Sequence, residues 1–427
     1  MKRSLIFLLI MLTAIALAVD YSATSPFPKD GAVILPFNGE ARLSWSVNNP
    51  YGKTLIYYLN VYDGENSQLF GPLTERSFSF PVKPGKTYSW KVKTVVYDEE
   101  YWSSQWEFHV PKTFDYLFGG IYWEYPVDAK IVNDEVVILG KRLNGTSYEA
   151  YQYKLSEEFN VVEQRFLGAF TPTDFWKDGI LGYENTEAGK VPIFCYDSGS
   201  TETIFPGAFS SIQLLKGFDN TIIFAGRSNT GTFAFVKKGE ELSKIKLGKL
   251  SLIDATVVGG KAVFVGSVSE ETLNFPVVVI GSEMVLKWRY QGWLLRVVSG
   301  ETDRFFYVLG IVPTPTNDYD VVLRKYTTDG IMLWSKTIDD FRDEIPGDIL
   351  LLDDRICVLE SVYDEGYKQR IFLYSFDGEP MGILENKTEK SEKPLKLLKI
   401  EPGFLTVGYS YEPGSKTQIA VRFFSKR

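Results

Sequence analysis

A short apolar strand that ends in glycine recurs along most of this 427-residue chain. The copies are Val136–Gly140, Gly179–Gly182, Ile222–Gly226, Ala262–Gly266, Phe306–Gly310 and Phe404–Gly408, with Ile356–Glu360 as a degenerate copy. Their last residues lie 42, 44, 40, 44, 50 and 48 positions apart. A repeat of this length indicates an array of similar units, each packed against its neighbours.

Each repeat carries further strand signals after the first one. A second glycine pattern closes four repeats, at Phe166–Phe170, Phe205–Phe209, Lys246–Leu250 and Tyr290–Leu294. Between the two patterns runs another strand, such as Asp320–Tyr326, followed by the turn Thr328–Gly330. Four strands per unit are typical of a propeller blade. The seven copies therefore predict a seven-bladed β-propeller.

The final repeat lacks an outer strand, because the chain ends shortly after the strand Thr417–Phe424. The segment Phe114–Ile121 matches the second glycine pattern, although it precedes the first repeat. An open ring would leave unpaired strand edges, which are an aggregation liability. We therefore expect this N-terminal strand to complete the last sheet, so that the propeller spans residues 114–427.

Residues 24–111 have a different pattern of short strands with alternating apolar and polar residues. The strands are Ala41–Val47, Tyr57–Tyr62, Ser77–Phe80, Thr87–Lys93 and Trp106–Val110, and turn residues such as Asp63-Gly64 separate them. Regular short strands of this kind predict a small β-sandwich.

This first region resembles a bacterial fibronectin type III domain. The matching features are the leading Pro26, the Asp30-Gly31 turn, Trp45, the run from Pro84 to Val92, and the closing Ser103–Phe108 segment. The resemblance implies an immunoglobulin-like sandwich that acts as a spacer or a binding module.

The repeat region is similar to propellers of the WD40-like and quinoprotein-like kind. Asp329–Trp334 resembles the Gly-to-Trp docking motif of quinoprotein repeats, and Met284–Trp288 is a fainter copy. The chain lacks the Gly-His and Trp-Asp dipeptides of WD40 repeats, and the adjacent cysteine pair common in quinoprotein dehydrogenases. We therefore expect no cofactor.

The first eighteen residues have the features of a secretory signal peptide. Lys2 and Arg3 precede the apolar run Leu5–Leu17, and Ala16-Leu17-Ala18 offers a small-x-small cleavage site. The alternative is a retained N-terminal membrane anchor. No later stretch has the length and hydropathy to cross a membrane, so no membrane insertion is expected after cleavage. The expected location is secreted or periplasmic, in the cell envelope.

The charge pattern indicates which partners the protein can bind, and the composition indicates the kind of organism it comes from. The net charge is −8, and the basic residues are interspersed among acidic ones without forming a stripe, which argues against nucleic acid. Lys and Glu are plentiful while Gln and His are scarce, and this composition favours a thermophilic source.

Few catalytic patterns are available to this chain. The one histidine, His109, lies in the first region, so the propeller can hold neither a Ser-His-Asp triad nor a histidine-rich metal site. No phosphate-binding Gly-Lys-Ser/Thr loop and no cysteine cluster with zinc spacing occur. We expect no metal, and we expect Cys195 and Cys357 to be buried and unpaired.

The repeat also predicts a ring of charged residues around the central channel. Three aspartates, Asp128, Asp254 and Asp348, lie twelve positions before the end of their strand pattern, as does Lys396. Arg296 lies fourteen before Gly310. These residues are the predicted ligand-binding set. The alternative is that such aspartates cap strand ends or turns.

Two tryptophans complete the predicted binding set. Trp176 and Trp293 are expected to precede innermost strands, where they would offer stacking surfaces. The alternative is burial between neighbouring sheets.

Taken together, these features predict an exported, non-catalytic binding or scaffold protein of the cell envelope. Its propeller face would bind a polysaccharide, a peptide or an envelope protein. The alternative is a carbohydrate-active enzyme, a glycoside hydrolase or lyase, that uses carboxylates in the propeller funnel. A quinone-cofactor enzyme is a third hypothesis, and it would require a cofactor cavity at the ring centre.

Overall fold

The structure is a computed structural model. It describes residues 19–34, 40–111, 113–119, 122–133, 135–156, 161–205, 207–228, 230–270, 273–288, 292–314, 319–338, 344–363, 367–388, 391–401, 403–410 and 416–425. The predicted signal peptide lies outside these residues. The described residues form strands and turns without a helix, which confirms the all-β class, and none of them belongs to a helix able to span a membrane. The chain forms two compact units, divided at Lys112 and Thr113.

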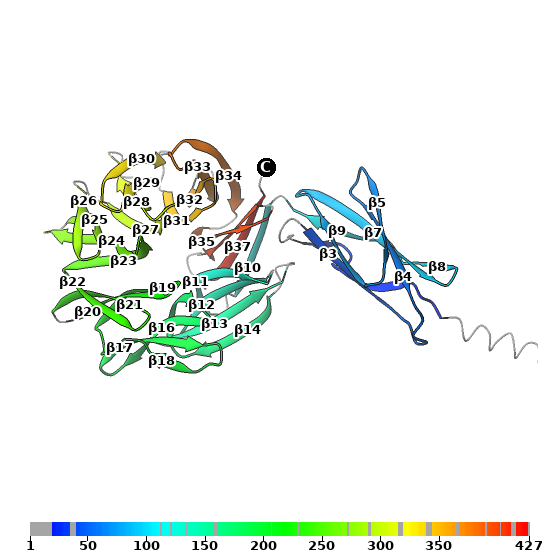
Figure 1. Cartoon of the computed structure of the whole chain (residues 1–427), viewed down its shortest axis with the longest axis horizontal. Helices are drawn as coiled ribbons and strands as arrows, with labels where there is room; N and C mark the ends of the chain where they lie inside the picture. Colours follow the sequence, from blue (N-terminus) through cyan, green and yellow to red (C-terminus); the bar gives the residue numbers. More distant parts are fainter. Residues whose placement is uncertain are drawn as a thin grey trace, which may run out of the picture. The chain divides into compact units, whose positions relative to one another are not determined.

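The first unit contains two sheets that share one core (Figure 1). One sheet orders β1 (Ala23–Phe27), β3 (Glu40–Val47) and β6 (Ser77–Pro81). The other orders β2 (Ala32–Val33), β9 (Trp106–Val110), β7 (Lys86–Val96), β4 (Ile56–Tyr62) and β5 (Ser67–Leu73), and β8 (Glu99–Trp102) pairs with β7. Alternation in β3 turns Trp45 inward, where its ring centroid lies 5.5 Å from that of Tyr57 and 6.4 Å from that of Trp90 in the other sheet.

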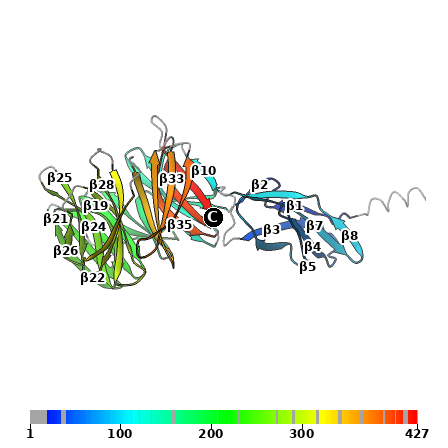
Figure 2. The same cartoon turned by 90° about the horizontal axis from the view of Figure 1, so that it is seen from above.

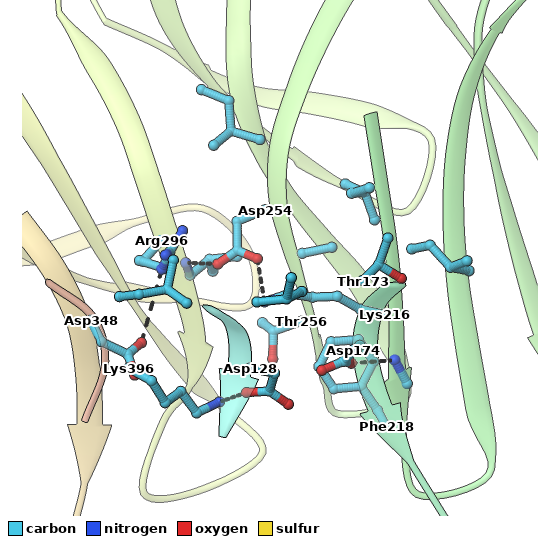
Figure 3. Close-up of a pocket in the computed structure, with 18 of the residues that line it drawn as sticks. Asp128, Thr173, Asp174, Lys216, Phe218, Asp254, Thr256, Arg296, Asp348 and Lys396 are labelled. Carbon is cyan, nitrogen blue, oxygen red and sulfur yellow. Dashed lines mark hydrogen bonds and ion pairs between the residues drawn. The ribbon is translucent and has the colours of Figure 1, made fainter. Parts of the chain in front are cut away.

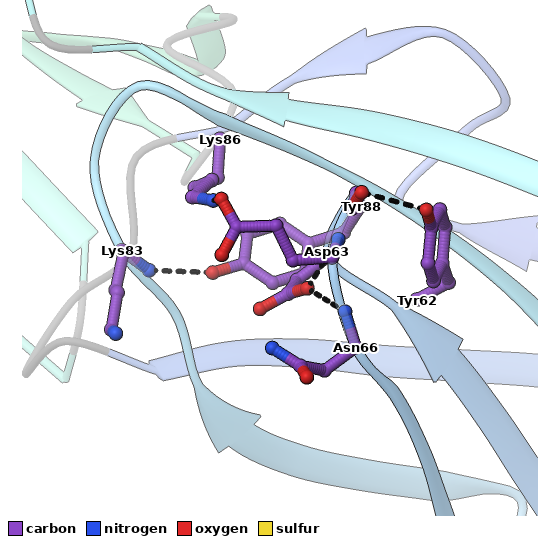
Figure 4. A network of polar contacts seen from close by, with 8 residues as sticks. Tyr62, Asp63, Asn66, Lys83, Lys86 and Tyr88 are labelled. Carbon is purple, nitrogen blue, oxygen red and sulfur yellow. Dashed lines mark hydrogen bonds and ion pairs between the residues drawn. The ribbon is translucent and has the colours of Figure 1, made fainter.

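Side-chain hydrogen bonds hold the turns at one end of this unit (Figure 4). In the β4–β5 turn, the Asp63 carboxylate accepts hydrogen bonds from the backbone nitrogens of Glu65 (2.9 Å) and Asn66 (2.7 Å). These two bonds hold the pKa of Asp63 below its ordinary value. In the β6–β7 turn, the backbone nitrogen of Lys83 donates to the Tyr88 hydroxyl at 2.8 Å. At each turn a polar side chain thus accepts hydrogen bonds from backbone groups that lack a strand partner.

The second unit contains seven four-stranded antiparallel sheets within its described residues (Figures 1 and 2). Sheet 1 is β11 (Trp123–Val132), β12 (Glu135–Asn144), β13 (Ser147–Leu155) and β14 (Val161–Gly168). Sheet 2 is β15 (Thr171–Trp176), β16 (Gly179–Thr186), β17 (Gly189–Tyr196) and β18 (Thr201–Thr203). Sheet 3 is β19 (Ser211–Phe218), β20 (Thr221–Ser228), β21 (Gly231–Lys238) and β22 (Glu241–Gly248). Sheet 4 is β23 (Leu250–Val258), β24 (Lys261–Glu270), β25 (Leu273–Ile280) and β26 (Glu283–Lys287).

The remaining three sheets complete the unit. Sheet 5 is β27 (Trp293–Ser299), β28 (Phe305–Pro313), β29 (Tyr319–Thr327) and β30 (Met332–Ile338). Sheet 6 is β31 (Glu344–Leu351), β32 (Ile356–Tyr363), β33 (Tyr367–Tyr374) and β34 (Pro380–Thr388). Sheet 7 combines β35 (Glu392–Ile400), β36 (Gly403–Ser410) and β37 (Gln418–Ser425) with β10 (Thr113–Gly119), which comes from the start of the unit.

The first strand of each sheet lies nearest the centre, and successive first strands follow one another around it (Figure 1). Strand β11 of sheet 1 also contacts β36 and β37 of sheet 7, so the first and last sheets are neighbours. Strand β10 pairs antiparallel with β37, and Leu117 faces Ala420 in this ladder. The expected pairing of residues 114–118 with the last C-terminal sheet is therefore confirmed. This arrangement of sheets is that of a β-propeller.

In sheets 2, 4, 5 and 7 the repeated glycine is explained by the close approach of the backbone of the first strand. A Cβ atom built on Gly266 would lie 2.0 Å from the carbonyl oxygen of Ser251, and one on Gly310 would lie 2.5 Å from that of Trp293. Such contacts leave room for a hydrogen atom alone, so glycine is required. In sheet 6, Glu360 takes this place and is fully buried opposite Pro346. Cys195 and Cys357 are both buried, and neither forms a disulfide, as predicted.

Candidate functional site

A cavity of about 600 Å³ lies where the seven first strands meet. Every one of these strands contributes to its wall, from Asp128 on β11 to Lys396 on β35. The lining mixes charged groups with hydroxyl groups and apolar side chains, as ligand pockets do. Figure 3 shows its charged residues pointing toward the centre.

A repeated β-bulge sets which side chains enter the cavity. In sheets 1 to 6, the pairing between the first and second strands shifts register at equivalent places. In sheets 1 to 5, the residue directly after the shift is, in order, Asp128, Asp174, Leu214, Asp254 and Arg296. In sheet 6 the irregular stretch contains Asp348. A bulge redirects a side chain and bends its strand. In sheets 1, 2, 4, 5 and 6 the residue at the bulge is charged and lines the cavity, whereas in sheet 3 it is the apolar Leu214.

The structure brings together five of the seven predicted site residues. The five that line the cavity are Asp128, Asp254, Arg296, Asp348 and Lys396. Three further charged residues that the sequence prediction missed, Asp174, Lys216 and Lys141, line the same cavity. We call the five predicted residues together with Asp174, Lys216 and Gln213 the polar belt.

Trp176 and Trp293 do not line the cavity in the described part of the chain. The prediction that Trp176 precedes an innermost strand is wrong, because β15 is short and Trp176 is its last residue. Its indole nitrogen donates to the carbonyl oxygen of Asp219 at 3.1 Å, and its ring covers Gly217 of sheet 3. Trp293 begins β27 and packs edge-on against Tyr319, with ring centroids 5.6 Å apart. Both indoles fill space within or between sheets.

Ion pairs of the polar belt connect neighbouring sheets (Figure 3). The pairs are Lys396 with Asp128 at 2.8 Å, Arg296 with Asp348 at 3.9 Å, and Lys216 with Asp254. The three aspartates are buried, whereas the side chains of Lys216 and Lys396 are each 35% exposed to solvent. Each pair therefore places a partly solvated cation over a desolvated carboxylate.

Backbone hydrogen bonds to belt side chains add further connections between neighbouring sheets. Five belt side chains each accept a hydrogen bond from a backbone nitrogen. The donor and acceptor residues are Phe175 and Asp128 (3.4 Å), Gly217 and Asp174 (2.9 Å), Leu252 and Gln213 (3.0 Å), Val297 and Asp254 (2.9 Å), and Leu397 and Asp348 (3.0 Å). Each donor lies on the first strand of the next sheet. The bonds to Asp128, Asp254 and Asp348 are charge-assisted, and such bonds are stronger than neutral ones.

The belt contacts form a complete circle. The aspartate bonds cross the junctions from sheet 1 to 2, 2 to 3, 4 to 5 and 6 to 7. Lys216 and Gln213 cross from sheet 3 to 4, and Arg296 crosses from sheet 5 to 6. Lys396 crosses the remaining junction, from sheet 7 to sheet 1. The belt therefore joins every neighbouring pair of sheets at the cavity wall.

Asp128 and Asp174 form a carboxyl pair within the belt. Burial opposes the ionisation of Asp128, but the ion pair with Lys396 and hydrogen bonds from Asp174 and the backbone of Ala129 together lower the pKa of this carboxyl below its ordinary value. Burial, and then the neighbouring Asp128, raise the pKa of Asp174 well above its ordinary value. The side chains hydrogen-bond to each other, so Asp174 holds a proton that Asp128 accepts.

The comparisons with known proteins concern the overall fold. No protein-family model matches this chain, and no curated protein matches it. Solved structures similar to it include the β-propeller domain of the Trilobed protease from Pyrococcus furiosus, with 12% identity and a TM-score of 0.45, covering 70% of this chain and 96% of that one. A quinonprotein alcohol dehydrogenase-like protein from Bacteroides thetaiotaomicron has 12% identity and a TM-score of 0.41, covering 84% and 95%. The exotype rhamnogalacturonan lyase YesX has 12% identity and a TM-score of 0.39, covering 96% and 90%.

Proposed function

We propose that this chain is an exported, non-catalytic binding protein whose ligand occupies the central cavity. In this proposal the seven sheets are the blades of one closed seven-bladed propeller. The first unit is a fibronectin type III-like sandwich that serves as a spacer or a second contact. The ligand is a polysaccharide, a peptide or an envelope protein, met outside the cytoplasm after the signal peptide has been removed.

The observation that carries the proposal is the polar belt. Its carboxylates are occupied by bonds between sheets, as with Asp254, which accepts from Val297 and pairs with Lys216. A catalytic carboxylate must be free to exchange a proton with a bound substrate. The belt supports a different role, because it holds the cavity wall rigid while leaving the cavity open. A rigid, pre-formed cavity reduces the entropic cost of binding a ligand.

Binding to the cavity can be tested with the mature chain and a blocked variant. Ser299 is exposed and lines the cavity, so Ser299→Trp should obstruct it, while Ser200→Trp places the same indole on the turn before the outer strand β18. Glycan arrays and pull-downs from envelope extracts should detect a ligand that the wild type and Ser200→Trp bind and Ser299→Trp does not. Blank arrays and pull-downs, or equal binding by all three proteins, would overturn the proposal.

A carbohydrate-active enzyme is the second candidate, and the Asp128–Asp174 pair is the observation that favours it. Two carboxyl groups whose pKa values are pushed apart are a known arrangement for acid–base chemistry. Glycosidases, however, hold their carboxyl groups roughly 5 Å or more apart, whereas these two hydrogen-bond to each other. Release of reducing sugar ends from a polysaccharide panel by the wild type, with loss of that release in Asp174→Asn, would establish this candidate.

A further inference from the structure

A lysine without a carboxylate partner lies on the wall of the cavity. Lys141 follows the repeated glycine of sheet 1 on β12, and its side chain lines the cavity between sheets 1 and 2. Burial, and then the nearby Lys190 of sheet 2, lower its pKa below the ordinary value. In the described residues, neither lysine forms an ion pair. This distinguishes both of them from the cations of the polar belt, each of which faces an aspartate.

Tyrosines surround these two lysines. The ammonium group of Lys141 lies 4.9 Å from the ring centroid of Tyr148, and that of Lys190 lies 4.8 Å from that of Tyr183, which also lines the cavity. Burial raises the pKa of Tyr148, with smaller contributions from the nearby Tyr125 and Tyr183. Tyr125 of sheet 1 packs edge-on against Tyr409 of sheet 7, with ring centroids 5.3 Å apart. We call Tyr125, Lys141, Tyr148, Tyr183, Lys190 and Tyr409 the tyrosine–lysine wall. Lys141 and Tyr183 are its members that line the cavity, and the others lie beside them.

The tyrosine–lysine wall is poorly explained as a stabilising feature. Two cations held near each other repel, and the burial of Lys141 adds a desolvation cost. Cation–π contacts with tyrosine offset part of this cost, but they do not neutralise the charge. Groups kept at a cost to stability are found where a ligand supplies the missing partner.

We propose that the tyrosine–lysine wall binds the carboxylate of a uronic acid residue in an acidic polysaccharide that enters the central cavity. This inference rests on the proposed binding function and specifies its ligand. The two ammonium groups would pair with the carboxylate, and the tyrosine hydroxyls and rings would contact the sugar ring. The hydroxyl side chains of Thr173, Thr256 and Ser299 on the same cavity wall match the hydroxyl groups of a saccharide.

The test is isothermal titration calorimetry on the mature full chain, with trimers of galacturonate, glucuronate and mannuronate and with their neutral counterparts. The wild type should bind at least one uronate trimer, and its neutral counterpart should bind more weakly. Lys141→Gln and Lys190→Gln should each weaken uronate binding by on the order of ten- to a hundred-fold, because each removes a charged partner. Lys244→Gln is the matched control, because Lys244 on the outer strand β22 makes the same kind of contact, at 4.3 Å, with the ring of Phe233 on β21. This variant should bind like the wild type.

A stability measurement separates recognition from a structural role. Lys141→Gln removes a buried charge and its repulsion with Lys190, so its thermal midpoint should equal or exceed that of the wild type. Weaker uronate binding together with an undiminished midpoint would support the proposal. A lowered midpoint with unchanged affinity would overturn it.

The remaining outcomes distinguish this inference from the proposed function on which it rests. Equal binding of neutral and uronate trimers, unaffected by Lys141→Gln, would overturn the inference and leave the binding function standing. Binding confined to sulfated trisaccharides or to a glutamate peptide would also overturn the uronate assignment. If no glycan, peptide or envelope extract supplies a ligand, both the inference and the proposed function fail.

Discussion

The carboxylate of Asp254 in sheet 4 accepts a hydrogen bond from the backbone nitrogen of Val297 in sheet 5, at 2.9 Å. The same carboxylate pairs with Lys216 of sheet 3, so one side chain connects three consecutive sheets. Asp254 is 2% exposed, which means that water cannot replace either partner. A buried acceptor that satisfies a backbone donor and a cation at once is costly to remove.

Asp254→Ala should therefore lower the free energy of unfolding by about 3 kcal/mol. Most of the loss comes from the buried amide of Val297, which would lose its acceptor, since the partly exposed Lys216 can recover contact with water. Chemical denaturation of the mature protein measures the change. Glu241→Ala removes an exposed carboxylate from the outer strand β22 and should change stability by less than about 0.5 kcal/mol. Equal effects of the two substitutions would contradict the role of the belt.

The repeated glycine makes a second prediction about the sheets themselves. Gly266→Ala would place a Cβ atom 2.0 Å from the carbonyl oxygen of Ser251, so the bulged strand β23 must move. We expect a loss of about 2 kcal/mol or more in the free energy of unfolding, as for other overpacked sites. Gly140→Ala is the comparison, because its Cβ atom would meet a movable ring atom of Tyr153 at 3.0 Å. Urea denaturation should rank Gly266→Ala as the more damaging; the opposite order would contradict the steric explanation.

The sequence predicted those belt residues that lie in hairpins of the same length, because such residues stand at the same distance from the repeated glycine. Asp128 and Asp254 lie twelve positions before their repeated glycines because the hairpins between the bulge and the glycine are equally long in sheets 1 and 4. The closing strand β10 was predictable for a related reason, since the last repeat visibly lacked its outer strand and the segment before the first repeat supplied it.

The sequence prediction missed Asp174 because the hairpin that contains it is shorter than that of sheet 1. Between the bulge and the turn, β15 and β16 are each two residues shorter than β11 and β12, so Asp174 lies eight positions before Gly182. The signal that identifies it is local: Pro172-Thr173-Asp174 repeats the Pro-x-Asp pattern of Pro126–Asp128. The partners of the belt were beyond prediction, because each donor lies on another sheet, such as Val297 at 43 positions from Asp254.

Burial of Glu360 makes the stability of the protein depend on pH. Burial, and then the nearby Glu344, raise the pKa of Glu360 to about 8. Arg370 lies 3.7 Å from this carboxyl, but it donates a closer bond to Glu385 at 2.9 Å, so burial dominates. The folded state thus retains a proton that the unfolded chain releases near pH 4.5. Because the folded state binds more protons, the free energy of unfolding falls as pH rises from about 4.5 to 8.

Glu360→Gln should remove this contribution, because the amide keeps the shape of the protonated acid and does not titrate. The variant should match the wild type near pH 4.5 and exceed its stability by up to about 4 kcal/mol at pH 8.5. Urea denaturation across this range measures the difference. Glu379→Gln, which changes an exposed carboxylate with 74% side-chain exposure, should leave the pH profile unchanged. Parallel profiles for Glu360→Gln and the wild type would show that Glu360 is ionised in the folded state.

A designed disulfide should form between the paired strands β10 and β37. Leu117 and Ala420 face each other in adjacent strands, so their Cα atoms lie within the range that a disulfide can bridge. The double variant Leu117→Cys/Ala420→Cys should oxidise to a single new crosslink, because Cys195 and Cys357 are buried. The crosslink closes a loop of roughly 300 residues, and it should stabilise the protein by roughly 2–4 kcal/mol through the entropy of the unfolded chain.

Peptide mapping by mass spectrometry identifies the crosslink, and denaturation with and without reductant measures its effect. The single variants Leu117→Cys and Ala420→Cys serve as controls, since neither can form this bond. If β10 completes sheet 7 in solution, oxidised protein should unfold at higher denaturant than reduced protein, and reduction should abolish the difference. Failure of the two cysteines to join under oxidising conditions would place β10 elsewhere and leave sheet 7 with an open edge, since β37 has no other outer partner in the described residues.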